Sequence, residues 1–262
     1  MSAKTEVWAE RLLFGAAMAA LVAGAWAALW FVGASPYVGY LDHRVALGST
    51  ALPYAAQVGV FVLGWLIMSV AMMLPSSLPL ITVFRTMTRR RPHRGRDLTL
   101  LVAGYLAMWG VFGLAAFLVD TAIHEAVERS GLLESGESLI VAGVLLVAGL
   151  FQFSPLKYSC LSQCRSPVGF LTSHWHGGDP RWAAFRLGLR HGLFCVGCCW
   201  ALMLLMFAVG GVNLGWMLAL GALMFAEKAL PWGRWLTAPV GALLTLWGLA
   251  LLLGLPFAPQ LV

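Results

Sequence analysis

The chain has 262 residues, of which 60% are apolar and only 11% are charged. Soluble domains carry a charge on about a quarter of their residues, so this composition excludes an ordinary soluble fold and indicates a membrane protein whose partner is the lipid bilayer. The formal net charge is +6. Its basic residues lie in short stretches between apolar runs, where they set membrane topology and do not predict nucleic-acid binding.

About seven apolar runs reach or approach the ~20 residues that cross a bilayer as a helix. In chain order they are 12–34, 57–74, 98–119, 138–153, 188–209, 214–226 and 235–253. The first run is longer than the core of a signal peptide, so we expect an uncleaved first helix. The sequence predicts an all-α, polytopic transmembrane helical bundle, with residues 1–262 as a single integral membrane domain. The run 214–226 is short enough for a re-entrant segment.

The charges between these runs predict the orientation. Six arginines follow the second run, between residues 85 and 96, and the segment after the fourth run is also basic. The loop after the third run is acidic, with five carboxylates between residues 120 and 137. Because Lys and Arg gather in cytoplasmic loops, we expect the N-terminus inside and the C-terminus outside.

The run from residue 191 to 206 combines membrane hydrophobicity with soft metal ligands. On a helix at 100° per residue, its histidine and three cysteines fall within a stripe about 100° wide. These four residues are His191, Cys195, Cys198 and Cys199. Imidazole and thiolate suit copper(I) or zinc, whereas the alternative is that these side chains only fill a buried helix. Gly188 and Gly192, both in the longer apolar run 188–209, give it a small-residue face for close helix packing.

A second pair of thiols, Cys160 and Cys164, follows the fourth run. Four residues apart, they share one face of a helix and could hold one metal ion together. Pro155 and Pro167 bracket the pair and limit the length of that helix. The alternative is a pair of buried interfacial cysteines. Topology places both groups of thiols on the cytoplasmic side.

Three further groups are candidate ligands on that side. Met72 and Met73 close the second run, and thioethers bind copper(I) far better than zinc, although core packing is the alternative. His174 and His176 point the same way on an extended stretch, as auxiliary ligands or as headgroup-region side chains. Glu227 and Lys228 end the sixth run, either with a functional role, Glu227 as an auxiliary site residue, or as side chains that snorkel to the surface.

The five cysteines all lie between residues 160 and 199. An odd number at helical spacing argues against a disulfide scaffold. The sequence contains no phosphate-binding Walker motif, no dinucleotide fingerprint and no Cys-x-x-Cys-His haem motif. A metal or thiol chemistry is therefore the function class that the motifs favour.

Several motifs carry a family resemblance. They are Ala71-Met-Met-Leu-Pro-Ser76, Cys160-x-x-x-Cys164-Arg-Ser-Pro167, Cys195-x-Gly-Cys-Cys-Trp200 and Glu227-Lys228. Together they resemble a bacterial family of predicted metal-binding integral membrane proteins, some members of which are labelled copper chaperones. The resemblance covers residues 64–228, the core that would hold the metal site. It implies metal binding and a bacterial cytoplasmic (inner) membrane.

We therefore expect a protein that binds copper(I), with zinc as the alternative, at the cytoplasmic face and passes it to a metalloprotein or metallochaperone partner. The candidate ligands are more numerous than one tetrahedral or trigonal ion can bind. Either two ions bind, or some of the residues pass the metal from one position to the next. A non-enzymatic role is the preferred interpretation. Two alternatives stay open: a membrane thiol–disulfide oxidoreductase that uses Cys195, Cys198 and Cys199, and a non-catalytic subunit of a membrane complex.

Overall fold

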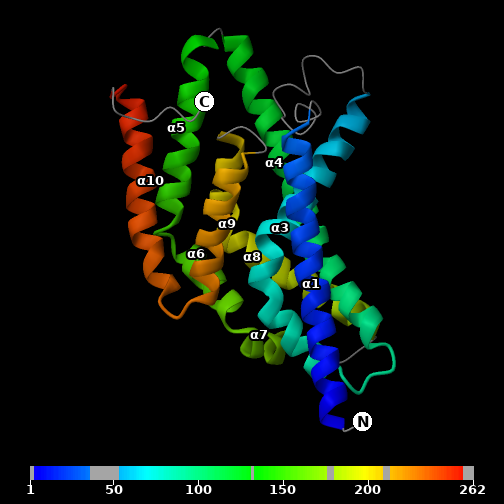
Figure 1. Cartoon of the computed structure of the whole chain (residues 1–262). Helices are drawn as coiled ribbons and strands as arrows, with labels where there is room; N and C mark the ends of the chain where they lie inside the picture. The colour runs from blue at the N-terminus through cyan, green and yellow to red at the C-terminus, as the bar shows by residue number, and fades with distance from the viewer. Residues whose placement is uncertain (1–2, 36–52, 131–132, 176–179, 209–212, 256–262) are drawn as a thin grey trace.

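The computed structural model describes residues 3–35, 53–130, 133–175, 180–208 and 213–255, and within these residues all regular structure is helical. The all-α prediction is therefore confirmed. The helices are α1 (Ala3–Gly33), α3 (Tyr54–Met87), α4 (Arg94–Ser130), α5 (Leu133–Phe151), α6 (Pro155–Arg165), α7 (Pro167–His174), α8 (Pro180–Ala208), α9 (Leu214–Ala229), the 3-10 helix η2 (Gly233–Leu236) and α10 (Thr237–Leu252) (Figure 1).

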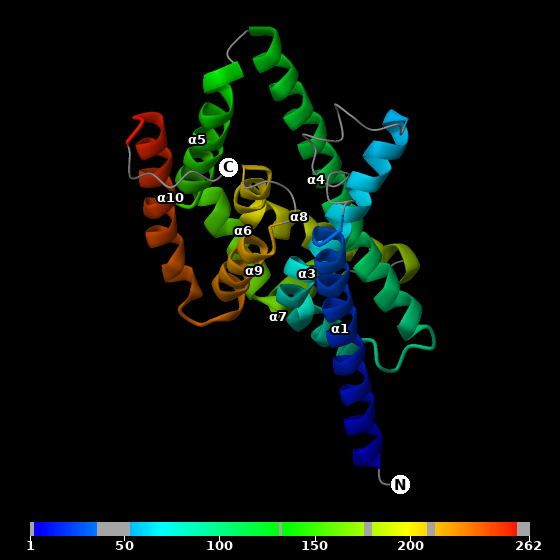
Figure 2. The same ribbon diagram turned by 45° about the horizontal axis from the view of Figure 1, so that its top comes forward.

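The bundle has two flanks and a centre. In Figures 1 and 2, α5 and α10 run side by side on one flank, while α1, α3 and α4 form the other. Helices α6, α8 and α9 lie between the flanks. The candidate metal ligands are concentrated on these central helices and on the side of α3 that packs against them.

Five helices are long and apolar enough to cross a membrane, over Trp8–Gly33, Tyr54–Met72, Arg94–Ile123, Trp182–Phe207 and Gly233–Leu252. Each matches a run that the sequence predicts as a span. The pair α5 and α6 passes the same test together but is bent by 65° at the break between them. Helix α9, the expected sixth span, has only 16 residues. The described residues thus give five or six candidate spans where the sequence predicts about seven.

Helix α3 does not end where the sequence predicts. The apolar run stops near residue 74, but the helix continues through Pro75 and Pro79 to Met87. Hydroxyl groups gather beside the prolines: Ser76 Oγ donates to the carbonyl of Met73 at 2.8 Å, and Ser77 Oγ does so at 3.4 Å. The carbonyls that lose their helical N–H partners to the two prolines are those of Ala71 and Pro75, so these serine bonds do not replace the lost ones. The helix nevertheless continues through both prolines and carries its methionines into the bundle interior.

The segment 154–187, expected as one long connection, is mostly helical. Ser154 caps α6, accepting a hydrogen bond from the backbone N–H of Lys157, and Pro155 and Pro167 stand at the starts of α6 and α7. A proline at the first helical turn loses no hydrogen bond there. The expectation that these prolines limit the helix around Cys160 is confirmed. By contrast, α8 begins at Pro180, eight residues earlier than predicted (188 − 180).

Small residues allow α4 and α8 to approach closely. A Cβ placed on Gly188 would lie 2.0 Å from the carbonyl oxygen of Leu101, and one on Gly104 would lie 2.2 Å from that of Phe185. One on Gly192 would lie 2.7 Å from the Met108 side chain. The predicted small-residue face of α8 is thus its contact with α4. This contact sets the rotation of α8 and hence where its cysteines point.

Replacing Gly188 with alanine should lower the midpoint of thermal unfolding of the detergent-purified protein. The added methyl group would meet backbone, which cannot move aside easily, and overpacking of this kind costs about 1–3 kcal/mol. Gly143→Ala is the matched control because nothing lies within 4 Å of a Cβ at that position of α5. An unchanged midpoint for Gly188→Ala would contradict the close α4–α8 contact.

Candidate metal centre

Four thiols and one thioether meet inside the bundle. Three thiols come from α8, one from α6 and the thioether from α3: Cys195, Cys198, Cys199, Cys164 and Met73. The sulfur atoms of Cys199 and Met73 are 3.7 Å apart, and those of Cys164 and Cys198 are 3.9 Å apart. Cys164 also interacts with Cys195. We call these five residues the sulfur cluster.

The backbone of α8 orients its own thiols. Cys198 Sγ donates to the carbonyl of Cys195 at 3.1 Å, and Cys199 Sγ donates to the same oxygen at 2.9 Å. Residues three and four apart share a helix face, so both thiols fold back toward Cys195. The helical stripe predicted from the spacing is present, and all three side chains are buried.

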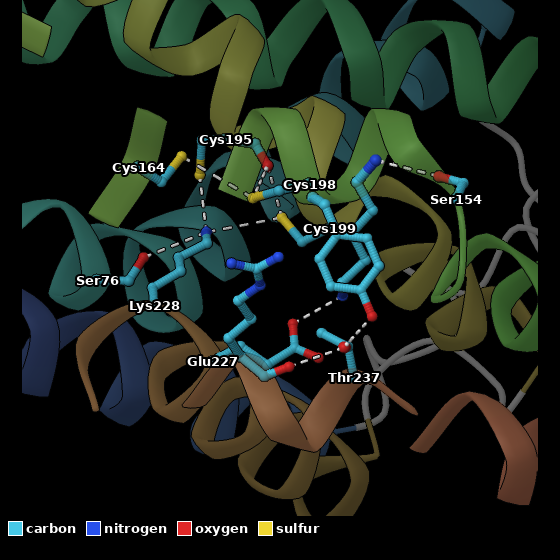
Figure 3. Close-up of polar contacts among 12 residues, drawn as sticks. Ser76, Ser154, Cys164, Cys195, Cys198, Cys199, Glu227, Lys228 and Thr237 are labelled. Atoms are coloured by element: carbon cyan, nitrogen blue, oxygen red, sulfur yellow. Dashed lines mark hydrogen bonds and ion pairs between the residues drawn. The ribbon is translucent and has the colours of Figure 1, made fainter. Parts of the chain in front are cut away.

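The side chain of Lys228 reaches into the sulfur cluster from α9. Its Nζ lies 3.0 Å from the sulfur of Cys195 and 3.4 Å from Ser76 Oγ. It is also 3.8 Å from the sulfur of Cys199 (Figure 3). The sulfur of Met73 lies at the same distance, 3.8 Å. Lys228 is only 7% exposed. A buried cation is stable only beside polar or anionic partners, and here sulfur atoms provide most of them.

An aromatic pair from α4 and α8 borders the cluster. The hydroxyl of Tyr105 lies 3.2 Å from Cys195 Sγ and 3.2 Å from the carbonyl of Met73, to which it donates. The ring of His191 stacks on Tyr105 with centroids 5.6 Å apart, and its Nε2 lies 3.2 Å from Ser77 Oγ. His191 Nδ1 is buried and has no hydrogen-bond partner among the described residues. His191 thus flanks the sulfur cluster through Tyr105.

A buried ion pair lies next to Lys228. Lys157 Nζ of α6 contacts Glu227 Oε2 of α9 at 2.7 Å, with side-chain exposures of 0% and 2%. Arg165 donates to the carbonyl oxygens of Glu227 and Pro231. Burial raises the pKa of the Glu227 carboxyl, and the charge of Lys157 acts in the opposite direction. The snorkelling interpretation of Glu227 is wrong, because the side chain is directed inward and ties α9 to α6.

The remaining candidate ligands lie outside these contacts. Met72 packs toward Gly221 of α9, where a Cβ would lie 3.5 Å from its side chain. The thiol of Cys160 faces Gly197 of α8, 2.6 Å from the place of a Cβ there. His174 ends α7, and its Nδ1 pairs with the carbonyl of Phe170 at 3.0 Å. The structure thus gives Cys160 and Cys164 different neighbours, although Cys160 also interacts electrostatically with Cys198. His176 lies outside the described residues.

Sequence reasoning missed Tyr105 and Ser76, and it weighed Lys228 together with Glu227 without assigning it to the thiols. One signal was available for the lysine, since the chain has only three lysines, Lys4, Lys157 and Lys228. Two of these stand at the boundary of an apolar run, where an ionisable side chain that stays inside needs a partner. Tyr105 and Ser76 carry no comparable signal, because tyrosine and serine are ordinary residues of apolar helices.

A protein-family model described as PpoB2, copper chaperone, matches residues 62–251. The chain belongs to this family. The matched range runs from α3 to α10 and includes every residue of the sulfur cluster, so the resemblance inferred from the sequence motifs is confirmed. Comparisons with curated proteins and with solved structures give no match.

The donor chemistry of the cluster fits the cargo that the PpoB2 family description names. Thiols together with a thioether favour copper(I) over zinc, whose sites combine Cys, His and carboxylate ligands. Among the described residues, however, no group of three or more His, Cys, Asp or Glu side chains has the arrangement of a metal site. In this PpoB2 family member three of the sulfur atoms, those of Cys195, Cys199 and Met73, instead contact the ammonium of Lys228.

The buried ion pair between Lys157 and Glu227 provides a test of the packing of α6 against α9. Lys157→Met leaves the Glu227 carboxylate buried without its partner, a change that costs about 3–5 kcal/mol, so the thermal midpoint should fall markedly. Adding Glu227→Gln removes the uncompensated charge and should restore much of the loss. Circular dichroism of the two variants in detergent measures both effects. A double variant no more stable than Lys157→Met would contradict the pairing.

Proposed function

We propose that this protein binds copper(I) as cargo in the sulfur cluster and passes it to a metalloprotein or soluble metallochaperone at the cytoplasmic face of a bacterial inner membrane. The observation that carries the proposal is the cluster of four thiols and a thioether from α3, α6 and α8, three sulfur atoms of which contact one buried cation, Lys228 Nζ. The family description, copper chaperone, supports copper as the metal. Five apolar helices of sufficient length support a membrane location.

Copper(I) fits this cluster better than zinc. Met73 lies within 3.7 Å of Cys199 Sγ, and a thioether beside a thiol is a donor pair that copper(I) prefers. The nearest imidazole, His191, is engaged with Ser77 and Tyr105. A cytosolic redox environment keeps thiols reduced, and all five cysteines are free.

Lys228 gives the cluster a means of exchanging its cargo. Copper(I) and the lysine ammonium each carry one positive charge, and both are attracted to Cys195 and Cys199. An ion that binds between these sulfurs and Met73 takes the position of Nζ, and the flexible lysine side chain withdraws. Cys199 gives up the proton that its Sγ donates to the Cys195 carbonyl, because a metal-bound thiol is deprotonated, and takes a proton up again when the ion leaves. When the ion leaves, the ammonium returns, so the sulfur atoms are not left without a cation. Reversible binding of this kind is what a chaperone requires.

Cys164 is the point at which the ion enters and leaves. It is the one sulfur of the cluster that is only partly buried, whereas Cys195, Cys198 and Cys199 are buried. Its Sγ lies 3.9 Å from that of Cys198, close enough for both to hold one ion at once during transfer. The ion then passes from Cys164 to the deeper thiols by exchanging one ligand at a time.

The direct test is copper(I) affinity measured by competition with a chromogenic copper(I) chelator under anaerobic conditions. Cys195→Ser should weaken binding by at least about tenfold, which corresponds to 1.4 kcal/mol, because Cys195 contacts both Lys228 and Tyr105. Cys160→Ser is the matched control: it removes another buried thiol, one that interacts electrostatically with Cys198 but has no place among the sulfur contacts of Lys228 and Met73, and should weaken binding much less. Equal losses in both variants, or none in Cys195→Ser, would contradict the proposal.

A parallel thiol count separates metal trafficking from thiol–disulfide exchange. In reducing buffer the purified protein should carry copper and release its thiols to a labelling reagent only after the metal is removed. A protein that cycles between thiol and disulfide with a quinone, with no bound metal, would refute the copper proposal. Serine replaces cysteine with little change of volume, so the variants should fold. The midpoint of thermal unfolding of each variant checks that it has done so.

A further inference from the structure

A second polar site lies apart from the sulfur cluster, between α1, α3 and the start of α4. It is a cavity of about 450 Å³. Four arginines from the three helices line it, and Glu10 is the only carboxylate among its lining residues. The arginines are Arg11, Arg85, Arg89 and Arg94. Four positive charges against one negative charge leave the cavity with a formal charge of +3 (4 − 1).

The carboxylate of Glu10 does not neutralise these arginines. It is shared between Arg94, at 3.4 Å, and Arg85, at 3.9 Å. Arg85 also donates to the backbone carbonyl of Glu10 at 2.9 Å. Burial, and then repulsion from Arg94, lowers the pKa of the Arg85 guanidinium, against which Glu10 acts only in part. The cavity therefore holds an excess of positive charge that favours an anion.

The other wall of the cavity is apolar. Phe14, Met18 and Leu78 line it, and the guanidinium of Arg85 lies 4.5 Å from the centroid of the Phe14 ring. This cation–π contact keeps the guanidinium in place beside the apolar wall. A ligand that fills this cavity has both a charged and an apolar part.

The position of the cavity along the helices also indicates which kind of ligand can reach it. The candidate spans of α1 and α4 begin at Trp8 and Arg94, so the arginines stand at the ends of the apolar segments. In Figure 1 these ends lie at the side of the bundle where the N-terminus is marked. At the ends of the spans, the groups nearest to a transmembrane protein are lipid headgroups.

We propose that this cavity binds the phosphate headgroup of an anionic phospholipid, with the beginning of its acyl chains along Phe14 and Met18. Arginine guanidinium groups match phosphate oxygens in a bidentate geometry. The volume lies within the range of small-ligand sites, about 300–1,000 Å³. Basic pockets between helices on the cytoplasmic side bind such headgroups in membrane proteins. The lipid would join α1 to α3 and α4, outside the copper site.

The test uses the full-length protein, purified in detergent and stripped of lipid. A ligand that binds only the folded state raises the midpoint of thermal unfolding. Phosphatidylglycerol should therefore raise this midpoint by an amount that levels off once the cavity is filled. Phosphatidylcholine and inorganic phosphate at matched ionic strength should raise it far less. Native mass spectrometry should find phosphatidylglycerol retained on the protein. An equal shift with inorganic phosphate would overturn the lipid assignment in favour of a free anion, and no shift with phosphatidylglycerol would overturn the site.

Two variants localise the effect. Arg89→Gln combined with Arg94→Gln removes two cavity charges and should abolish most of the shift with phosphatidylglycerol. Arg90→Gln is the matched control, since Arg90 is exposed, adjacent to Arg89 and not part of the cavity lining. An equal loss in both would mean a general surface-charge effect and would overturn the proposal. Copper(I) affinity should stay unchanged in every variant, so failure of the lipid site is distinguishable from failure of the copper proposal.

Discussion

The contact between a lysine ammonium and buried sulfur atoms is the interaction on which the candidate site depends. Lys228 is 7% exposed and places its Nζ 3.0 Å from the sulfur of Cys195. Taking a cation out of water is expensive unless its surroundings compensate, and each neighbouring helix supplies part of that compensation. Met73 and Ser76 come from α3, Cys195 from α8, and Tyr105 of α4 contacts both Cys195 and the backbone of Met73. The position of one side chain therefore depends on the packing of four helices.

The packing that permits this contact rests on small residues and on a second buried ion pair. Gly188 lets α8 lie against the backbone of α4, which turns the thiols of α8 toward α3 and α9. Lys157 and Glu227 join α6 to the end of α9 at 2.7 Å, next to Lys228. Helix α6 thereby brings Cys164 to the thiols of α8, 3.9 Å from Cys198. The bend of 65° between α5 and α6 allows this approach.

The helices and the thiol stripe could be predicted from the sequence because both follow from local periodicity. The spacing of Cys195, Cys198 and Cys199 fixes one face of any helix that contains them. Which neighbours that face meets depends on tertiary packing, so neither the contact between Lys228 and Cys195 nor the role of Tyr105 could be predicted. Cys160 and Cys164 are chemically equivalent in the sequence, and only the rotation of α6 distinguishes them. The end of an apolar run likewise does not end α3, which tertiary packing carries on through Pro75 and Pro79 to Met87.

X-ray absorption spectroscopy at the copper edge of the anaerobically loaded protein tests the central claim most directly. The sulfur cluster predicts copper(I) with a first coordination shell dominated by sulfur, because the sulfur atoms of Cys199 and Met73 lie 3.7 Å apart and both, like that of Cys195, contact the ammonium of Lys228. Substituting Cys195 with serine should reduce the sulfur contribution. A shell dominated by nitrogen or oxygen, or a spectrum that Cys195→Ser leaves unchanged, would contradict the assignment of this cluster as the copper site.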